Sequence, residues 1–361
     1  MIALAALLAL QGQYLFSEFA LPDADGKPSH LLINQTKEKR AGGPKISPRT
    51  FGEPPHKFEF DWVTGAYVEN AQDPSYRDLR FRVYSQERKD KDDPAWNVTR
   101  MLLRLWEINR RDYTMDHNPL YNEGLVDVYL CQDGLAGGEQ RFDVDDQQTP
   151  PAKVNTIYIY DLSSFSDPVE MAREVAHEYG HAMLFPVGGF LKPEEWANGY
   201  LGEKIYLRKI SAKMAAGQLW PSDAMGADKD KLAAWVSKNV DSIVDPIALK
   251  GPRMDLVKTR GQASMNAYLG AALWVEEAYG PTVFARTMKL NGNADVSGYM
   301  EAVKLAVQEP DRITVNIPSR LAGKSLYLPV ANAKVEGGKV LLRKDGWAKI
   351  QPSGPLTIVN R

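Results

Sequence analysis

The chain has 361 residues, of which 44% are hydrophobic and 25% charged, values typical of a folded globular protein. This length predicts two or three structural units rather than one small core. The formal net charge is −2 and no basic cluster alternates with aromatic residues, so the sequence argues against nucleic-acid binding. A single cysteine, Cys131, excludes an internal disulfide framework and cysteine-rich zinc modules. Its place in an apolar run favours a buried strand position.

The first ten residues form an apolar run that is too short to span a bilayer. Its length matches the apolar part of a signal peptide, and the alternative is a buried N-terminal helix. We therefore expect a signal segment over residues 1–20 and export to the periplasm or the extracellular space. The rest of the sequence predicts no stable membrane span.

A loosely structured leader is expected over residues 21–57, which are rich in Gly, Pro, Lys and Ser. Polar and apolar residues then alternate over 79–84, a pattern typical of a half-buried strand. Asp93-Pro94 predicts the start of a helix with an apolar face. Branched and aromatic residues predict further strands at 125–131 and 156–160.

A helix is predicted from Pro168, because Asp167 suits its cap and Glu170 follows at the third position. It should run to about Phe185, where Pro186 and the pair at 188–189 stop it. A second helix is expected at 199–213, and helices should dominate from there to about residue 309.

The C-terminal part predicts short strands, with Gly337-Gly338 and Asp345-Gly346 as the turns between them. We expect these strands at 325–330, 334–342, 347–350 and 356–359. The sequence thus predicts an α+β fold: a small mixed sheet packed on the helix from Pro168, a helical lobe, and a β module. The expected boundaries are a catalytic domain at 58–312, whose sheet and active helix reach to about 198, and the β module at 313–361.

The sequence His177-Glu178-Tyr179-Gly180-His181 carries the chemistry. Residues four apart on a helix lie one above the other, so both imidazoles project from one face. Neutral imidazole nitrogens suit Zn²⁺, and the two histidines supply two corners of a tetrahedron. Glu178 lies on the adjacent side of the helix, where its carboxylate can take a proton from a metal-bound water. The pattern predicts a zinc-dependent hydrolase.

A catalytic zinc needs a third protein ligand and one open position. The candidates are Glu194, Glu195 and Glu203, all after the glycine pair at 188–189. Glu203 is preferred, because a place inside the second helix would present it near the level of Tyr179 on a rigid element. The other two come earlier, in a loop or first turn, and Glu195 is preferred over Glu194.

The stretch from Glu174 to Leu207 resembles the gluzincins, the group of zinc metallopeptidases that contains thermolysin and the zinc aminopeptidases. In that group a glutamate ligand follows the HExxH helix by about twenty residues on the next helix. Tyr200-Leu201-Gly202-Glu203 is similar to the aromatic-x-x-Glu of the aminopeptidase branch. The resemblance extends weakly over residues 79–300, where 268–274 and 278–280 resemble a helix of bacterial gluzincins.

The resemblance also implies that a strand such as 156–160 forms the sheet edge along which a peptide substrate pairs. The chain departs from the group in two ways. Asn198 is followed directly by Gly199, so the Asn-Glu-Gly core of the aminopeptidase motif is not intact. No histidine follows His181, so a tyrosine would have to steady the oxyanion, for which Tyr268 is the candidate; its alternative is a core position.

The resemblance implies hydrolysis of peptide bonds, with Zn²⁺ as the cofactor and a peptide or protein as the substrate. One alternative is an inactive gluzincin-like scaffold with a binding or structural role. Another is a zinc hydrolase that acts on a non-peptide amide. An intact Glu178 argues against the first, since a structural metal site has no use for a general base. The sequence leaves the endo- or exopeptidase mode and the oligomeric state open.

Overall fold

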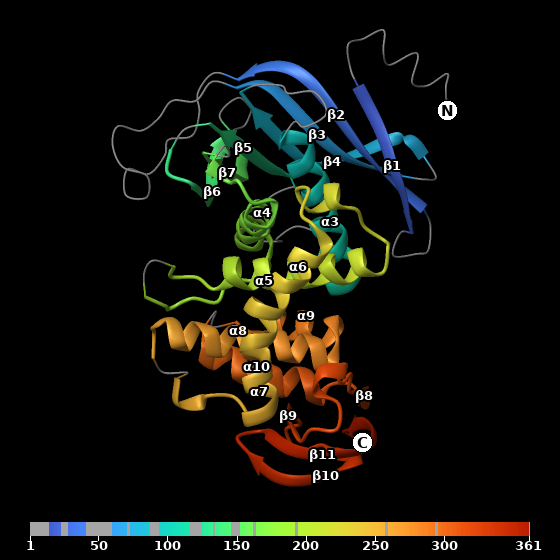
Figure 1. Ribbon diagram of the computed structural model, residues 1–361, viewed down its shortest axis with the longest axis vertical. Coiled ribbons are helices and arrows are strands. Elements are labelled where there is room, and N and C mark those ends of the chain that lie inside the picture. The colour runs from blue at the N-terminus through green and yellow to red at the C-terminus, as the bar shows by residue number, and fades with distance from the viewer. Residues whose placement is uncertain are drawn as a thin grey trace. The chain divides into compact units, whose positions relative to one another are not determined.

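The computed structural model describes residues 14–22, 28–40, 60–70, 73–86, 94–115, 125–132, 134–145, 152–161, 164–191, 194–256, 259–292 and 295–360 (Figure 1). The chain divides into two compact units. The first contains residues 1–111, 116–183 and 209–232, and the second contains 112–115, 184–208 and 233–361. Residues 1–13 of the signal segment expected at 1–20 lie outside the described residues, whereas residues 14–20 belong to strand β1 (Tyr14–Pro22).

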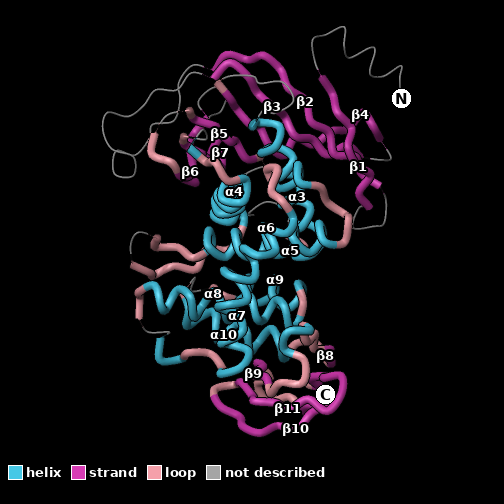
Figure 2. Tube along the Cα trace, in the orientation of Figure 1, coloured by secondary structure: helices cyan, strands magenta, loops and turns pink. Residues whose placement is uncertain are grey.

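A seven-stranded mixed sheet forms the frame of the first unit, in the order β1-β2-β3-β4-β5-β7-β6 (Figure 2). β1 to β4 pair antiparallel with their neighbours, β4, β5 and β7 run parallel, and β6 is antiparallel to β7. The strands are β1 (Tyr14–Pro22), β2 (Pro28–Arg40), β3 (Phe60–Asn70), β4 (Asp73–Ser85), β5 (Val126–Cys131), β6 (Gly137–Asp145) and β7 (Ala152–Tyr160).

Alternation along the parallel strands explains how the sheet is packed. Register places Tyr84, Tyr129 and Tyr158 side by side, and their rings stack with centroids 4.8 and 5.1 Å apart. Stacked aromatic neighbours contribute roughly 0.5–1.5 kcal/mol each beyond the area they bury. Cys131 is buried in the same cluster, as the sequence predicts. Val83 and Val128, one residue away, face the other side of the sheet.

Two helices cover that other side, α3 (Pro94–Tyr113) and α4 (Pro168–Met183) (Figure 1). The ring of Phe81 contacts Tyr179 of α4 at a centroid distance of 6.1 Å. Asn109 of α3 donates to the Tyr179 hydroxyl at 3.4 Å. α3 lies between β4 and β5 in the chain, so it forms the crossover that parallel strands require.

The observed sheet corrects two expectations. Residues 28–40, expected in a loose leader, form β2, where Leu31, Leu32 and Ile33 are buried. Their short apolar run was hidden by the polar residues around it. The strand expected at the sheet edge, 156–160, lies inside the sheet as part of β7, because β6 pairs on its outer side.

Helices dominate the second unit. They are α5 (Asn198–Ala215), α6 (Lys229–Val236), α7 (Ser242–Lys250), α8 (Gln262–Tyr279), α9 (Pro281–Leu290) and α10 (Val296–Gln308), of which α5 and α6 each have one end in the first unit. A five-residue π-helix, Ser237–Asp241, joins α6 to α7. The expected second helix at 199–213 corresponds to α5.

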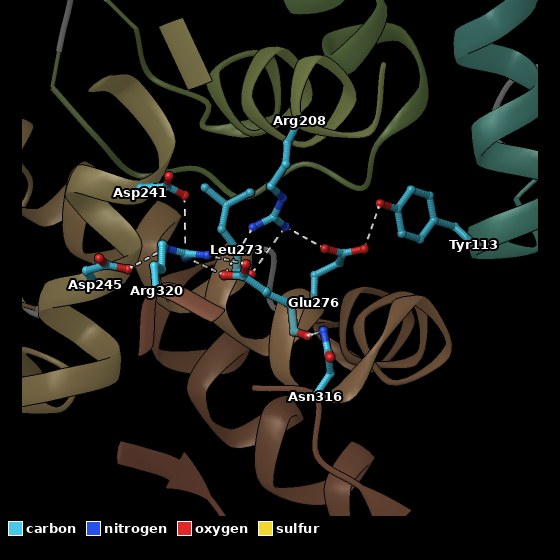
Figure 3. Close-up of polar contacts among 9 residues, drawn as sticks. Tyr113, Arg208, Asp241, Asp245, Leu273, Glu276, Asn316 and Arg320 are labelled. Atoms are coloured by element: carbon cyan, nitrogen blue, oxygen red, sulfur yellow. Dashed lines mark hydrogen bonds and ion pairs between the residues drawn. The ribbon is translucent and has the colours of Figure 1, made fainter. Parts of the chain in front are cut away.

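A chain of charged contacts connects these helices (Figure 3). Glu276 accepts hydrogen bonds from Tyr113, at 3.2 Å, and from Arg208. Arg320 donates to both carboxylate oxygens of Glu277 at 2.7 Å and to Asp245 at 3.0 Å. These contacts join three helices, α5, α7 and α8, to the segment around Arg320, so the unit is stabilised by charge pairing as well as by its apolar core.

The C-terminal strands pack within the second unit and form a four-stranded antiparallel sheet in the order β10-β11-β8, with β9 also paired to β11. They are β8 (Arg312–Thr314), β9 (Leu326–Pro329), β10 (Lys334–Lys344) and β11 (Trp347–Val359). Asp345 and Gly346 make the predicted turn, with positive φ at both. Gly337-Gly338 makes no turn but lies inside β10 at a register shift, where the φ of Gly337 is 79°.

The architecture is α+β, as the sequence predicts. None of the helices that the structure describes is both long and apolar enough to cross a bilayer.

Candidate metal centre

The helix α4 begins where its sequence predicts. Asp167 caps it by accepting a hydrogen bond from the backbone N–H of Val169 at 3.0 Å, and Pro168 takes the first position. The helix ends at Met183, two residues before the predicted end at Phe185. Near the C-terminal end of the helix, the carbonyl of Ala182 accepts a hydrogen bond from Asn155 of β7 at 2.9 Å. The helix is thus fixed at both ends.

The two histidines of α4 converge on one point. Their Nε2 atoms are 3.2 Å apart, and their rings meet at an interplanar angle of 70°. Two nitrogens at ~2.0–2.1 Å from a tetrahedral zinc would be about 3.3 Å apart. The observed separation therefore fits two ligands of one metal ion. His177 is buried and His181 is partly exposed, which leaves a side open to solvent.

A third ligating group comes from the segment that follows α4. Ring nitrogens of His177 and His181 and a carboxylate oxygen of Glu194 all lie within 4.8 Å of one another. Glu194 is partly exposed. Two imidazole nitrogens and one carboxylate oxygen are a donor set that zinc takes in catalytic sites, with a fourth position left open.

The segment around Glu194 has local structure of its own. Phe190 donates to the carbonyl of Glu195 at 3.3 Å, and Ala197 donates to the carbonyl of Val187 at 2.8 Å. Gly188 forms a bridge with Trp196. These contacts fold the chain back on itself and place Glu194 near the end of the resulting loop.

Glycine is required at position 188 by this arrangement. A Cβ there would lie 2.5 Å from two ring atoms of Trp196, so only glycine lets the indole ring lie against the backbone. The pair at 188–189 thus does more than end α4. It lets the chain fold back on itself, so that Gly188 pairs with Trp196.

The structure brings Glu194 to the histidines and does not bring the other two candidates there. Glu203 is buried on α5, where its carboxylate pairs with Lys204. Glu195 is exposed. Within the part of the chain that the structure describes, the group of His177, His181 and Glu194 is the one arrangement suited to a metal ion. The preference for Glu203 has no support from this geometry.

The general base candidate lies beside the histidines on the same helix. Glu178 is 3% exposed, and it packs against the start of β6. α4 therefore presents its two histidines and this carboxylate from one rigid element.

Tyr268, the candidate for steadying an oxyanion, lies in the interior of the second unit. Its ring meets Tyr299 edge-on at 5.0 Å and lies 6.2 Å from Phe190. Its hydroxyl makes no hydrogen bond to any residue that the structure describes. Complete burial raises the pKa of Tyr268 well above its usual value. These contacts are those of a core tyrosine, and its catalytic role stays a prediction.

Comparisons with protein-family models, with curated proteins and with solved structures find no match to this chain.

Proposed function

We propose that this protein is a zinc-dependent hydrolase of peptide bonds, in which His177, His181 and Glu194 hold the metal. The observation that carries the proposal is the convergence of these three groups within 4.8 Å, at the histidine spacing that one helical turn provides. Glu178 supplies a reason to prefer catalysis to a structural role. A purely structural site needs ligands, whereas a carboxylate beside them is what general-base chemistry needs.

A zinc ion bound there would lower the pKa of a water ligand and polarise the substrate carbonyl. The residues of the chain would then move one proton. Glu178 accepts it from the water as the oxygen–carbon bond forms, and returns it to the amide nitrogen as the carbon–nitrogen bond breaks. The low exposure of Glu178 supports this role, because a buried carboxylate is shielded from competing bulk water.

The edge strand β6 supports a peptide as the substrate. It pairs with β7 on one side and is the last strand in the order of the described sheet. It lies against α4, since Gly138 of β6 contacts Glu178. An extended peptide that adds to this edge would run past the carboxylate, held by backbone hydrogen bonds that any peptide can make.

The test combines metal content with turnover in one variant. Glu178→Gln keeps the shape of the side chain but removes its basicity, so zinc content should stay near one ion per chain while hydrolysis falls by at least ~100-fold. Zinc is measured by mass spectrometry of purified protein, and hydrolysis by product analysis of a mixed peptide library.

Each other result has a definite meaning. Full activity in Glu178→Gln would remove the mechanism. Wild-type protein that binds zinc but cleaves no peptide would indicate a binding scaffold or a hydrolase of another amide. Wild-type protein that binds no zinc would contradict the metal centre itself.

A further inference from the structure

Gly138, the second residue of β6, lies unusually close to the carboxylate of Glu178. A Cβ at this position would lie 2.7 Å from both Cδ and Oε1 of Glu178, and closer still to its Cγ. These separations are far inside the ~3.5–4.0 Å at which carbon atoms attract each other. Any residue other than glycine must therefore displace the Glu178 side chain.

The backbone conformation at position 138 does not require a glycine. Gly138 is not among the residues with positive φ, whereas its neighbour Gly137 has a φ of 150°. A Cβ at Gly137 would meet nothing closer than Oε1 of Glu174, at 4.0 Å, which is ordinary contact. Gly137 is thus needed for its backbone conformation, whereas Gly138 leaves room for the side chain of Glu178.

We propose that Gly138 is a positioning residue for Glu178: its missing side chain leaves the space that the Glu178 carboxylate occupies. The catalytic consequence rests on the proposed function, but the contact itself does not. Because the atoms contacted belong to the Glu178 side chain, a methyl group should move the carboxylate and leave the backbone of α4 in place. His177 and His181 should then keep their positions.

The contact is tested by thermal unfolding of four proteins: wild type, Gly138→Ala, Glu178→Ala and the double variant. Gly138→Ala should lower the Tm by at least ~2 °C, as overpacking of a buried contact does. In the Glu178→Ala background the same change should lower it little or not at all, because the methyl group fills space that the carboxylate has left. This cycle needs neither zinc nor substrate.

Gly354→Ala is the matched control. Gly354 also lies in a strand, β11, a Cβ there would meet nothing within 4 Å, and its φ is not positive. Its substitution should leave the Tm unchanged or slightly higher.

The catalytic consequence has its own measurement. Gly138→Ala should keep wild-type zinc content and a KM within about twofold, while kcat falls at least ~10-fold through misplacement of the base. In a Glu178→Gln background, Gly138→Ala should cause no further loss of kcat, because the group it displaces is already inactive.

The outcomes separate the two proposals. Additive Tm changes would overturn the positioning role, whatever the hydrolysis result. Coupled Tm changes with unaltered kcat in Gly138→Ala would also overturn it. Coupled Tm changes in a wild-type protein that cleaves no peptide would leave the contact standing and refute the proposed function. If Gly138→Ala fails to fold, folding of the double variant supports the contact, and failure of both overturns it.

Discussion

The three proposed zinc ligands differ in how firmly the chain holds them. His177 and His181 project from a helix that Asp167 caps and Asn155 anchors. Glu194 comes from a loop held by backbone contacts between Val187, Phe190 and the residues opposite them. The histidines are therefore a preformed pair, whereas the carboxylate depends on the folding of its loop.

This difference leads to a prediction about the third ligand. Glu194→Ala should produce a protein that loses zinc to a mild chelator, since a carboxylate bound directly to the metal contributes much of the affinity. Glu203→Ala and Glu195→Ala should keep their zinc. Metal content after dialysis against the chelator is the measurement for all three variants.

Glu203 is the informative comparison, because it is buried and pairs with Lys204. Its removal leaves a buried ammonium group and should lower the Tm even though zinc stays bound. Zinc loss in Glu203→Ala, with full zinc in Glu194→Ala, would restore the assignment that the sequence favoured.

A second prediction concerns Tyr268. Its buried hydroxyl has no hydrogen-bond partner among the described residues, so Tyr268→Phe removes a polar group that costs free energy in the folded state. The Tm should stay the same or rise, and kcat should be kept. An oxyanion donor would behave differently: its loss lowers kcat by ~10²–10³-fold. Steady-state kinetics on Tyr268→Phe decides between the two roles.

The sequence predicts the helical part of the candidate centre, but it places Glu194, the loop residue, last among three candidate third ligands. His177, Glu178 and His181 could be recognised because a fixed helical repeat converts their spacing directly into geometry. No such rule applies to Glu194, whose position depends on how a loop turns back. The glycine pair at 188–189 and Trp196 are the available signals, but from the sequence alone the pair indicates only the end of a helix, and Trp196 alone predicts no turn.

At the scale of elements, helices and strands with a clear start or a clear apolar pattern in the sequence are predicted correctly, and strands without such a pattern are not. α3 and α4 each begin at a proline after an aspartate, so the sequence predicts both starts correctly, and it predicts the end of α4 to within two residues. β4, β5 and β7 were found through their apolar or alternating patterns. The sequence does not predict β1, β2, β3 and β6, since polar residues interrupt them and pairing with neighbouring strands stabilises them.

The charged network around Arg320 leads to a prediction about pH. Burial raises the pKa of Asp241. The positive charge of Arg320 lowers this pKa, and the negative charges of Glu277 and Asp245 raise it further (Figure 3). A carboxyl whose pKa is higher in the folded state destabilises the fold when ionised, and the penalty is relieved as pH falls through that pKa. Asp241→Asn should therefore raise the Tm at pH 7, with a gain that shrinks toward pH ~4.

Asp228 is the matched control with the opposite sign. It accepts backbone hydrogen bonds from Lys231 and Asp230 at the start of α6, and these lower its pKa. Ionised Asp228 therefore stabilises the fold at pH values above the pKa that it has in the unfolded chain. This stabilisation is lost as the pH falls through its lower pKa in the folded state. Asp228→Asn should lower the Tm at pH 7 and have less effect in acid. Thermal unfolding across pH 3.5–8 compares both variants, and equal signs at pH 7 would contradict the account.

At the scale of the whole molecule, export of the chain is a proposal that the N-terminal sequence motivates. We expect protein from its native host to lack the apolar run that ends near Gln11. Cleavage should occur before Tyr14, because β1 begins there and pairs with β2. Mass spectrometry of the intact protein gives the N-terminus. Finding Met1 on cytoplasmic protein would show that the chain is not exported.

The order of strands in the first unit has a consequence for the time at which the metal centre can form. β1, β2 and β3 each pair antiparallel with the next strand in the chain, so the strands β1 to β4 can associate soon after they meet. The pairing of β4 with β5 must instead bring together residues such as Arg82 and Asp127, 45 positions apart, and such contacts form slowly. α4 packs against β7 and β6, and these strands are joined to β1 to β4 through the slowly formed pairing of β4 with β5. A newly made chain should therefore acquire its zinc late, after most of the sheet is complete.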